Sequence, residues 1–368
     1  MKTKILSFAK ANAVVLIAAT AALVTSFIIP PDRAYLGYFD LKTLTCLFCV
    51  LAVVCALRNI RFFYTLAKAI IRKFKNTKYS ILALVYITFI GSMLIANDMA
   101  LLTFLPLGYF VLRTTGKEKY MAFTYIMQNI AANLGGMLTP FGNPQNLYLY
   151  TKFSIPDGEF IRIMFPPFIV AISLITALCL IFVKSEPLEI EEKAAELPKA
   201  RVAIYLVLFA LSILIVFRTI PFFIGLIIIP IALLFLDREA LKSVDYGLLL
   251  TFVFFFIFSG NMARIDAVRS FFSSLLERNT LLFSALSCQV ISNVPSAILL
   301  SQFTANYRDL LLGVNIGGVG TLIASLASLI TFKAYSKDQP GNTLSYILKF
   351  TAFNVLFFAV LVVFCAII

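Results

Sequence analysis

The residues of this sequence that could do chemistry are mainly asparagine, glutamine, serine and threonine, gathered at a few points of a chain that is 61% hydrophobic. The densest group is NLGGMLTPFGNPQN at 133–146, which holds three asparagines, a glutamine, a threonine and two prolines. Amide and hydroxyl groups can coordinate a cation or hold an anion. Prolines and adjacent glycines break helices and free backbone groups that need partners. The stretch therefore suits an ion-binding site built into a broken helix.

Several kinds of chemistry are excluded by what the sequence lacks. It contains no histidine, which removes His-based triads, zinc sites and proton relays. It has neither a G-x-x-x-x-G-K-[ST] phosphate loop nor a G-x-G-D motif, and few acids lie within its apolar segments. The six cysteines lie in apolar segments and are interpreted as packing residues. We therefore expect neither an intramembrane enzyme nor a nucleotide-driven pump.

An internal repeat explains the polar stretch. Residues 133–148 align without a gap on NIGGVGTLIASLASLI at 315–330. The pairs are Asn133/Asn315, Gly135/Gly317, Gly136/Gly318, Thr139/Thr321 and Leu147/Leu329, with Asn143 and Asn146 facing Ser325 and Ser328. Upstream, IAND at 95–98 matches ISNV at 291–294, which pairs Asn97 with Asn293. The polar groups thus occur in two equivalent sets.

The elements that position these residues are membrane-spanning helices. A mean hydropathy of +0.96 and 37 phenylalanines indicate a polytopic membrane protein. Spanning segments are predicted near 12–29, 41–57, 120–140, 161–183, 200–217, 221–236, 245–259, 308–332 and 344–367. The first follows three lysines, so a cleaved signal peptide is an alternative to the retained helix that we expect.

The net charge of +13 comes from basic clusters in a few loops, which indicates a membrane protein and no nucleic-acid partner. In RNIRFFYTLAKAIIRKFK at 58–75, the basic residues share one helical face and apolar residues the other. This predicts a helix lying flat at the cytoplasmic interface, with a long cytoplasmic loop as the alternative. The N-terminus is then cytoplasmic and the C-terminus outside.

Two apolar stretches, 79–112 and 281–306, carry asparagine at their midpoints between runs of roughly 15 residues. Such runs are short for full crossings and fit re-entrant hairpins with polar tips. The first repeat is then 1–183, with interfacial helix 58–75, hairpin 79–112 and broken helix 120–150. The second is 200–368, with interfacial helix 261–279, hairpin 281–306 and broken helix 308–332. An acidic cytoplasmic linker, 184–199, joins them.

The predicted fold is thus an all-α polytopic membrane protein with two inverted-topology repeats, each holding a re-entrant hairpin and an unwound transmembrane helix. The extra helix at 200–217 makes the second unit enter the membrane from the opposite side. Inverted repeats with broken helices at matching positions are typical of secondary transporters.

At these residues the sequence resembles the ion transporter superfamily, which includes citrate transporter-like proteins, divalent anion–sodium symporters, arsenite permeases and some sodium–proton antiporters. The resemblance rests on SMLIANDMALLTFLP (92–106), NLGGMLTPFGNPQNL (133–147), ISNVPSAILL (291–300) and GVNIGGVGTLIASLASLI (313–330). It implies a homodimer in the plasma membrane, moving by an elevator-like or rocking mechanism. Dicarboxylate carriers of the superfamily have Ser-Asn-Thr at both tips, whereas this chain has Ala96-Asn97-Asp98 and Ser292-Asn293-Val294.

The candidate site residues form two overlapping sets. The substrate set is Asn97, Asn143, Gln145, Asn146, Ser292, Asn293, Ser296, Thr321, Ser325 and Ser328. The coupling-ion set is Asn97, Asp98, Thr139, Asn143 and Asn293, with sodium at the hairpin tips as one option. The alternatives are structural. Asp98 and the tip asparagines would cap helices, the residues at 143–146 would satisfy backbone freed by proline, and the hydroxyls would serve close helix packing.

The function expected from these features is ion-coupled transport of a small anion, either a di- or tricarboxylate or an inorganic oxyanion. No organic cofactor is expected, and sodium or a proton would be the coupling ion. Sodium–proton antiport and arsenite-type efflux are the alternatives. The expected partners are the anion, the lipid bilayer and a second copy of the chain.

Overall fold

The computed structural model describes residues 13–188 and 197–368, and over these ranges the chain forms helices and no β-strand. Within them, six helices are long and apolar enough to cross a membrane. They are α3 (Leu41–Asn59), α5 (Thr77–Ile95), α9 (Asp157–Phe182), α10 (Lys199–Val216), α13 (Tyr246–Ala263) and α18 (Thr343–Ile367). The prediction of an all-α polytopic membrane protein is confirmed.

Further helices complete the described parts of the chain. In the first half they are α2 (Ala13–Ile28), η1 (Arg33–Tyr38), α4 (Phe62–Ile71), α6 (Asn97–Thr114), η2 (Glu118–Tyr120), α7 (Met121–Gly135), η3 (Gly136–Leu138) and α8 (Pro144–Lys152). In the second half they are α11 (Phe222–Leu236), α12 (Arg238–Lys242), α14 (Asp266–Ile291), α15 (Asn293–Leu300), α16 (Tyr307–Ile316) and α17 (Leu326–Asp338). α14 is kinked at Asn279, whose φ of −165° and ψ of 91° are not helical.

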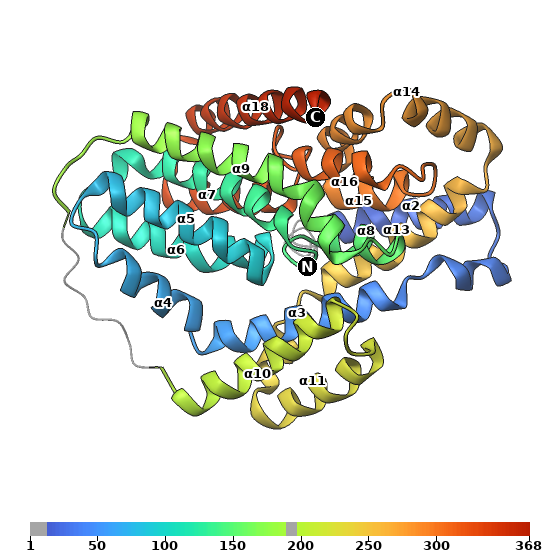
Figure 1. Cartoon of the computed structure of the whole chain (residues 1–368), viewed down its shortest axis with the longest axis horizontal. Helices are drawn as coiled ribbons and strands as arrows, with labels where there is room; N and C mark the ends of the chain where they lie inside the picture. Colours follow the sequence, from blue (N-terminus) through green and yellow to red (C-terminus); the bar gives the residue numbers. More distant parts are fainter. Residues whose placement is uncertain (1–12, 189–196) are drawn as a thin grey trace, which may run out of the picture.

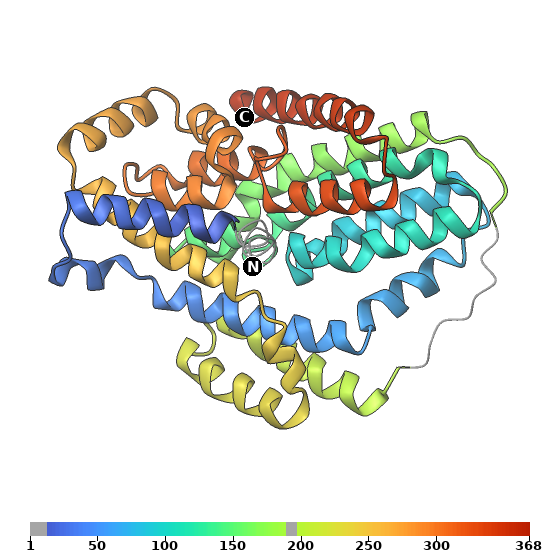
Figure 2. The same cartoon turned by 180° about the vertical axis from the view of Figure 1, so that it is seen from behind.

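Figure 1 shows α5, α6 and α7 together at one end of the molecule and α13, α14, α15 and α16 at the other. Figure 2 shows the same separation from behind. α10 and α11 project from one edge, where both pack against α3. α7 and α8 are the most deeply buried helices of the first half, since every residue of 124–135 and 144–151 is buried. Their polar residues must therefore find partners inside the protein.

The two halves share an order of elements. α3 to α9 give a long helix, a short helix, two helices meeting at a tip, a helix broken near glycines, a short helix and a long helix. α13 to α18 give the same order when α14 is divided at Asn279. The predicted broken helices are interrupted at 136–143 and 317–325, since α7 and α16 end there and α8 and α17 begin after them.

The basic segment 58–75 differs from the flat amphipathic helix that its periodicity predicts. Arg58 belongs to the last turn of α3, and Arg61 turns the chain with a positive φ of 57°. Lys68, placed on the solvated basic face by the periodicity, is only 6% exposed and lies 5.0 Å from the centre of the Phe110 ring. Because α4 packs against both α5 and α6, the face that carries Lys68 is covered.

The first residues of the linker form hydrogen bonds and ion pairs with neighbouring loops. Thr77 donates its backbone N–H to the carbonyl oxygen of Glu186 at 2.9 Å. The Glu186 carboxylate accepts from the ammonium groups of Lys117 and Lys119, both at 2.6 Å, and from the Tyr120 hydroxyl. Residues 189–196 of the predicted linker, and the lysines before α2, lie outside the described residues.

Candidate functional site

The two predicted hairpin tips have the same backbone conformation. Ala96 has φ 66° and ψ 151°, and Ser292 has φ 73° and ψ 159°. A positive φ is uncommon outside glycine and marks a constrained turn. Each turn ends one helix and starts the next at an asparagine, Asn97 in α6 and Asn293 in α15.

Each tip is held against the broken helix of its own half. Asn97 donates its backbone N–H to the carbonyl oxygen of Gly142 at 3.1 Å, and Asn293 donates to that of Ala324 at 2.9 Å. Gly142 and Ala324 are equivalent positions of the sequence alignment. Each asparagine Oδ1 also accepts the next backbone N–H at 2.9 Å. The tip of one helix pair and the break of another thus form one unit in each half.

Asparagine side chains connect these units. Asn97 donates from Nδ2 to Oδ1 of Asn133 at 3.2 Å. Asn143 donates to Oδ1 of Asn315 at 3.2 Å, and Asn315 donates to Oδ1 of Asn146 at 2.6 Å, across the two halves. All five side chains are buried. Hydrogen bonds in such low-dielectric surroundings are strong when complete and costly when incomplete.

The tip of the second half approaches the same network. A Cβ added to Gly318 would lie 3.2 Å from Nδ2 of Asn293 and 3.5 Å from Oδ1 of Asn133. The absence of a side chain at Gly318 therefore leaves room for both amides beside its backbone. Ser325 and Ser328 bond to each other at 2.9 Å, and Asn129 donates to Ser328 at 3.3 Å.

Some predicted residues also serve the broken backbone. Nδ2 of Asn146 lies 3.2 to 3.3 Å from the carbonyl oxygens of Gly136, Met137 and Thr139, to which it donates. In the second half, Gln289 makes the equivalent hydrogen bonds to the broken backbone. It donates to the carbonyl oxygens of Gly317 and Val319 at 2.9 and 3.1 Å and accepts the N–H of Thr321 at 2.8 Å. The structural alternative, in which residues 143–146 satisfy backbone groups freed by proline, therefore applies in part to Asn146.

The hydroxyls of Thr321, Ser292 and Thr139 donate to backbone carbonyl oxygens, and that of Ser292 also lies 3.4 Å from Oδ1 of Asn293. The Thr321 side chain is exposed and donates to the carbonyl oxygen of Gln289 at 3.3 Å. The half-buried Ser292 hydroxyl donates to the carbonyl oxygen of Ala324 at 3.3 Å, and Thr139 donates to that of Met93 at 2.7 Å. These three hydroxyls are occupied by backbone acceptors.

Several buried polar atoms of the predicted set have no hydrogen-bond partner among the described residues. They are Oδ1 of Asp98, Oδ1 of Asn143, Oε1 of Gln145 and Oγ of Ser296. Such atoms are costly unless water or a ligand satisfies them. Asn143 stands at the N-cap position of α8 without capping it, because no side-chain capping bond forms there. Four acceptor oxygens at breaks and tips are therefore available to an ion.

Asp98 is not the N-cap of α6, which was the structural alternative to a coupling role. α6 begins at Asn97, its N-cap position is Ala96, and no side chain caps it. Asp98 lies within the first turn, and its own N–H is accepted by Oδ1 of Asn97. The capping interpretation of Asp98 is wrong, because the helix starts two residues earlier than that interpretation requires.

No group of three or more His, Cys, Asp or Glu side chains that could hold a metal ion occurs among residues 13–188 and 197–368. A cation at the tips would instead use amide, hydroxyl and backbone oxygens together with Asp98, the donor type that suits hard cations.

Asn129, Gln289 and Asn315 are parts of the network that sequence reasoning did not place among the site residues. In the sequence, Asn315 was noted only as the residue that aligns with Asn133 in the repeat. Asn129 is one helical turn before Asn133, whose Nδ2 donates to the Asn129 carbonyl oxygen. That periodicity was the signal that could have found it.

Comparisons with known proteins identify the family to which the sequence is similar. Residues 5–308 match the family model described as citrate transporter, CitMHS. The chain is 34% identical over 293 residues to the uncharacterized transporter MJ0456 of Methanocaldococcus jannaschii, covering 79% of this chain and 80% of the relative. It is 30% identical over 279 residues to the inner membrane protein YbiR of Escherichia coli K12, covering 74% of each.

Proposed function

The chain belongs to the citrate transporter family and is a multi-pass membrane transporter, and we propose that it couples transport of a small anion to an ion gradient. Di- and tricarboxylates and inorganic oxyanions are the substrate classes. Membership of the family and the name of its relative point to a transporter and away from an enzyme.

The observation that carries the proposal is the meeting of helix N-termini at tips and breaks. α6 and α15 start at the two tips, and their first N–H groups bond to the segments from which α8 and α17 start. The side chains of Asn143 and Asn315 then join the halves. Helix N-termini carry partial positive charge, which favours an anion nearby. Discontinuous helices that present such ends at a central site are typical of secondary transporters.

The coupling ion is proposed to bind at the first tip. Asp98 brings a carboxylate whose Oδ1 has no partner among the described residues, beside Asn97. A carboxylate within the membrane is costly unless a cation, a proton or a polar cavity accompanies it. Sodium or a proton at Asp98 would offset the anion's charge and link its movement to a gradient.

The orientation, location and assembly that we propose are an N-terminus inside the cell, a C-terminus outside, a plasma-membrane location and a homodimer. They follow from the basic clusters and from the resemblance to the superfamily. The similar tip conformations of Ala96 and Ser292 support the equivalence of the two halves on which the proposed inversion rests.

The test is uptake and counterflow by the purified full chain in liposomes, with citrate, succinate, sulfate, phosphate and arsenite as substrates. We expect accumulation of at least one anion that depends on an inward sodium or proton gradient. Sodium–proton exchange without movement of any of these anions would favour antiport instead. The absence of gradient-dependent anion accumulation would contradict the proposal.

A further inference from the structure

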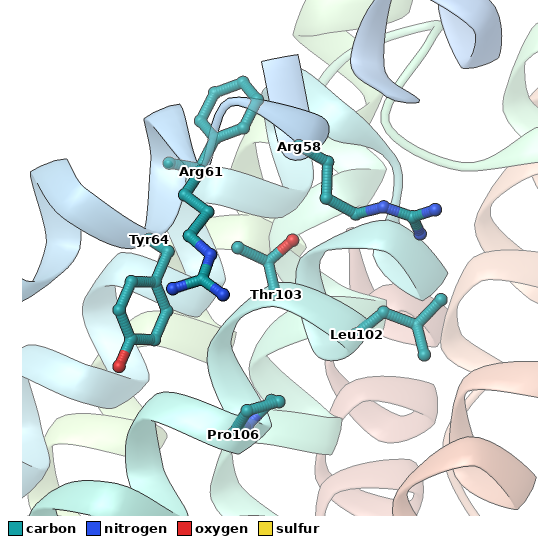
Figure 3. Close-up of a pocket in the computed structure, with 7 residues that line it drawn as sticks. Arg58, Arg61, Tyr64, Leu102, Thr103 and Pro106 are labelled. Atoms are coloured by element: carbon teal, nitrogen blue, oxygen red, sulfur yellow. The ribbon is translucent and has the colours of Figure 1, made fainter. Parts of the chain in front are cut away.

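A separate cavity of about 310 Å³ lies where α3 turns into α4, against the side of α6. Arg58, Arg61, Phe63, Tyr64, Leu102, Thr103 and Pro106 line it. Figure 3 shows the guanidinium groups of Arg58 and Arg61 reaching towards different sides of this cavity, with Thr103 between them. The remaining wall is largely apolar. The cavity therefore combines two fixed positive charges with a hydrophobic surface.

Neither guanidinium has a carboxylate partner within the described ranges 13–188 and 197–368. Among the described residues, the acceptor that Arg58 reaches is the sulfur of Met99, at 3.4 Å, which is a weak acceptor. The neighbouring acid Asp237 is occupied by Asn59, whose Nδ2 lies 3.2 and 3.3 Å from its oxygens. Two arginines at one cavity thus retain most of their donors.

In the second half, an arginine in the corresponding turn binds a carboxylate. Arg264 is the first residue after α13, and Arg61 is the second residue after α3, each in the turn that leads to the next helix. Its Nη2 donates to Oδ2 of Asp32 at 2.7 Å and its Nη1 to Oδ1 at 3.1 Å, a bidentate pair. In the second half a carboxylate of the chain itself fills this place. In the first half no described residue does.

We propose that the α3–α4 cavity is a binding site for an oxyanion, a phosphate or carboxylate group held by Arg58 and Arg61. The two sources of this chemistry are the head group of an anionic lipid and a small free oxyanion. The arginine fork matches both geometrically. Phe63, Leu102 and Pro106 offer apolar surface beside the charges. This site is distinct from the asparagine network and does not rest on the proposed transport activity.

The test is binding to the purified full chain in neutral detergent, measured by native mass spectrometry and by thermal stability. The probes are dioctanoyl phosphatidylglycerol, dioctanoyl phosphatidylcholine and inorganic phosphate. We expect the double variant Arg58→Gln/Arg61→Gln to bind the anionic probe at least about tenfold more weakly than the wild type. The matched control is Arg33→Gln/Arg269→Gln, which removes two exposed arginines elsewhere and should bind normally.

The outcomes separate the sources. Loss of phosphatidylglycerol binding in the double variant assigns the site to lipid, and loss of phosphate binding alone assigns it to a free oxyanion. If the double variant does not purify as a folded protein, Arg58→Lys/Arg61→Lys keeps the charges without the forks and should bind more weakly than the wild type. Wild-type affinity in the glutamine or lysine variant, or no binding of either anionic probe to the wild type, would overturn the proposal.

Discussion

At the scale of single residues, Asp98 is the position where the structure separates two interpretations. Asn97 accepts the N–H of Asp98 and no side chain caps α6, so the Asp98 carboxylate does not cap the helix. Asp98→Asn keeps its shape and removes its charge. We expect roughly tenfold or greater loss of gradient-driven accumulation with substrate exchange retained, because exchange needs no net ion movement.

The measurement is uptake into liposomes with sodium varied at fixed pH, and then with pH varied at fixed sodium. Normal accumulation by Asp98→Asn under both gradients would show that the coupling site lies elsewhere. The polarity of this tip could be read from the sequence. The role of Asn97 as acceptor could not, since it depends on where α6 begins.

At the scale of elements, the second broken helix depends on one glutamine from α14. Gln289 bonds to Gly317, Val319 and Thr321, three backbone groups that the break leaves open. Gln289→Ala should cost about 1–3 kcal/mol of stability, because buried backbone groups lose their partners. The control is Gln302→Ala, whose amide lies just beyond the end of α15 and donates to the carbonyl oxygen of Ile298 at 3.5 Å. Equal melting temperatures of the two variants would contradict this assignment.

The linker start is a second element-scale prediction. Lys117, then Lys119, hold the pKa of Glu186 down at about 2, below its ordinary 4.5. Because the folded-state pKa is lowered, the contacts stabilise the protein fully above about pH 4.5 and are lost as pH falls towards 2. The melting-temperature difference between wild type and Glu186→Gln should be constant from pH 8 to about 5 and shrink below that.

Glu239→Gln is the control for Glu186→Gln, because the pair of Glu239 with Lys242 is exposed and within one helix. A difference between wild type and Glu186→Gln that stays constant down to about pH 3 would show that the Glu186 contacts do not stabilise the fold.

The elements were predictable to different degrees. Hydropathy placed the long helices α3, α9, α10, α13 and α18, but it assigned the segment of α5 to a hairpin arm, whereas α5 has 19 residues and is apolar enough to span. Glycines placed both breaks, and only the first break also contains proline. Lys68 was misplaced on a solvated face because tertiary packing against α5 and α6 decides its burial. Gln289 was missed because its partners lie about thirty residues further along the chain, and no local pattern indicates that contact.

At the scale of the whole molecule, inverted halves predict that Lys73 and Gly158 face opposite sides of the membrane. Both positions are exposed, and the six native cysteines are buried among the described residues. Single cysteines at 73 and 158 in a cysteine-free background should react with impermeant reagents from opposite sides. Equal reactivity from one side would contradict the inverted-repeat arrangement.

The central claim is that the two tips and the breaks form one anion site, and Asn293→Ala tests it most directly. Asn293 is buried at the second tip, close to Asn133 of the first half. The matched control is Asn354→Ala, another buried asparagine, whose amide donates to its own helix α18. With equal amounts of folded protein in liposomes, we predict about tenfold lower ion-driven uptake for Asn293→Ala, because one hydrogen bond to the anion is lost. We predict near-normal uptake for the control. Wild-type uptake by Asn293→Ala would contradict the account.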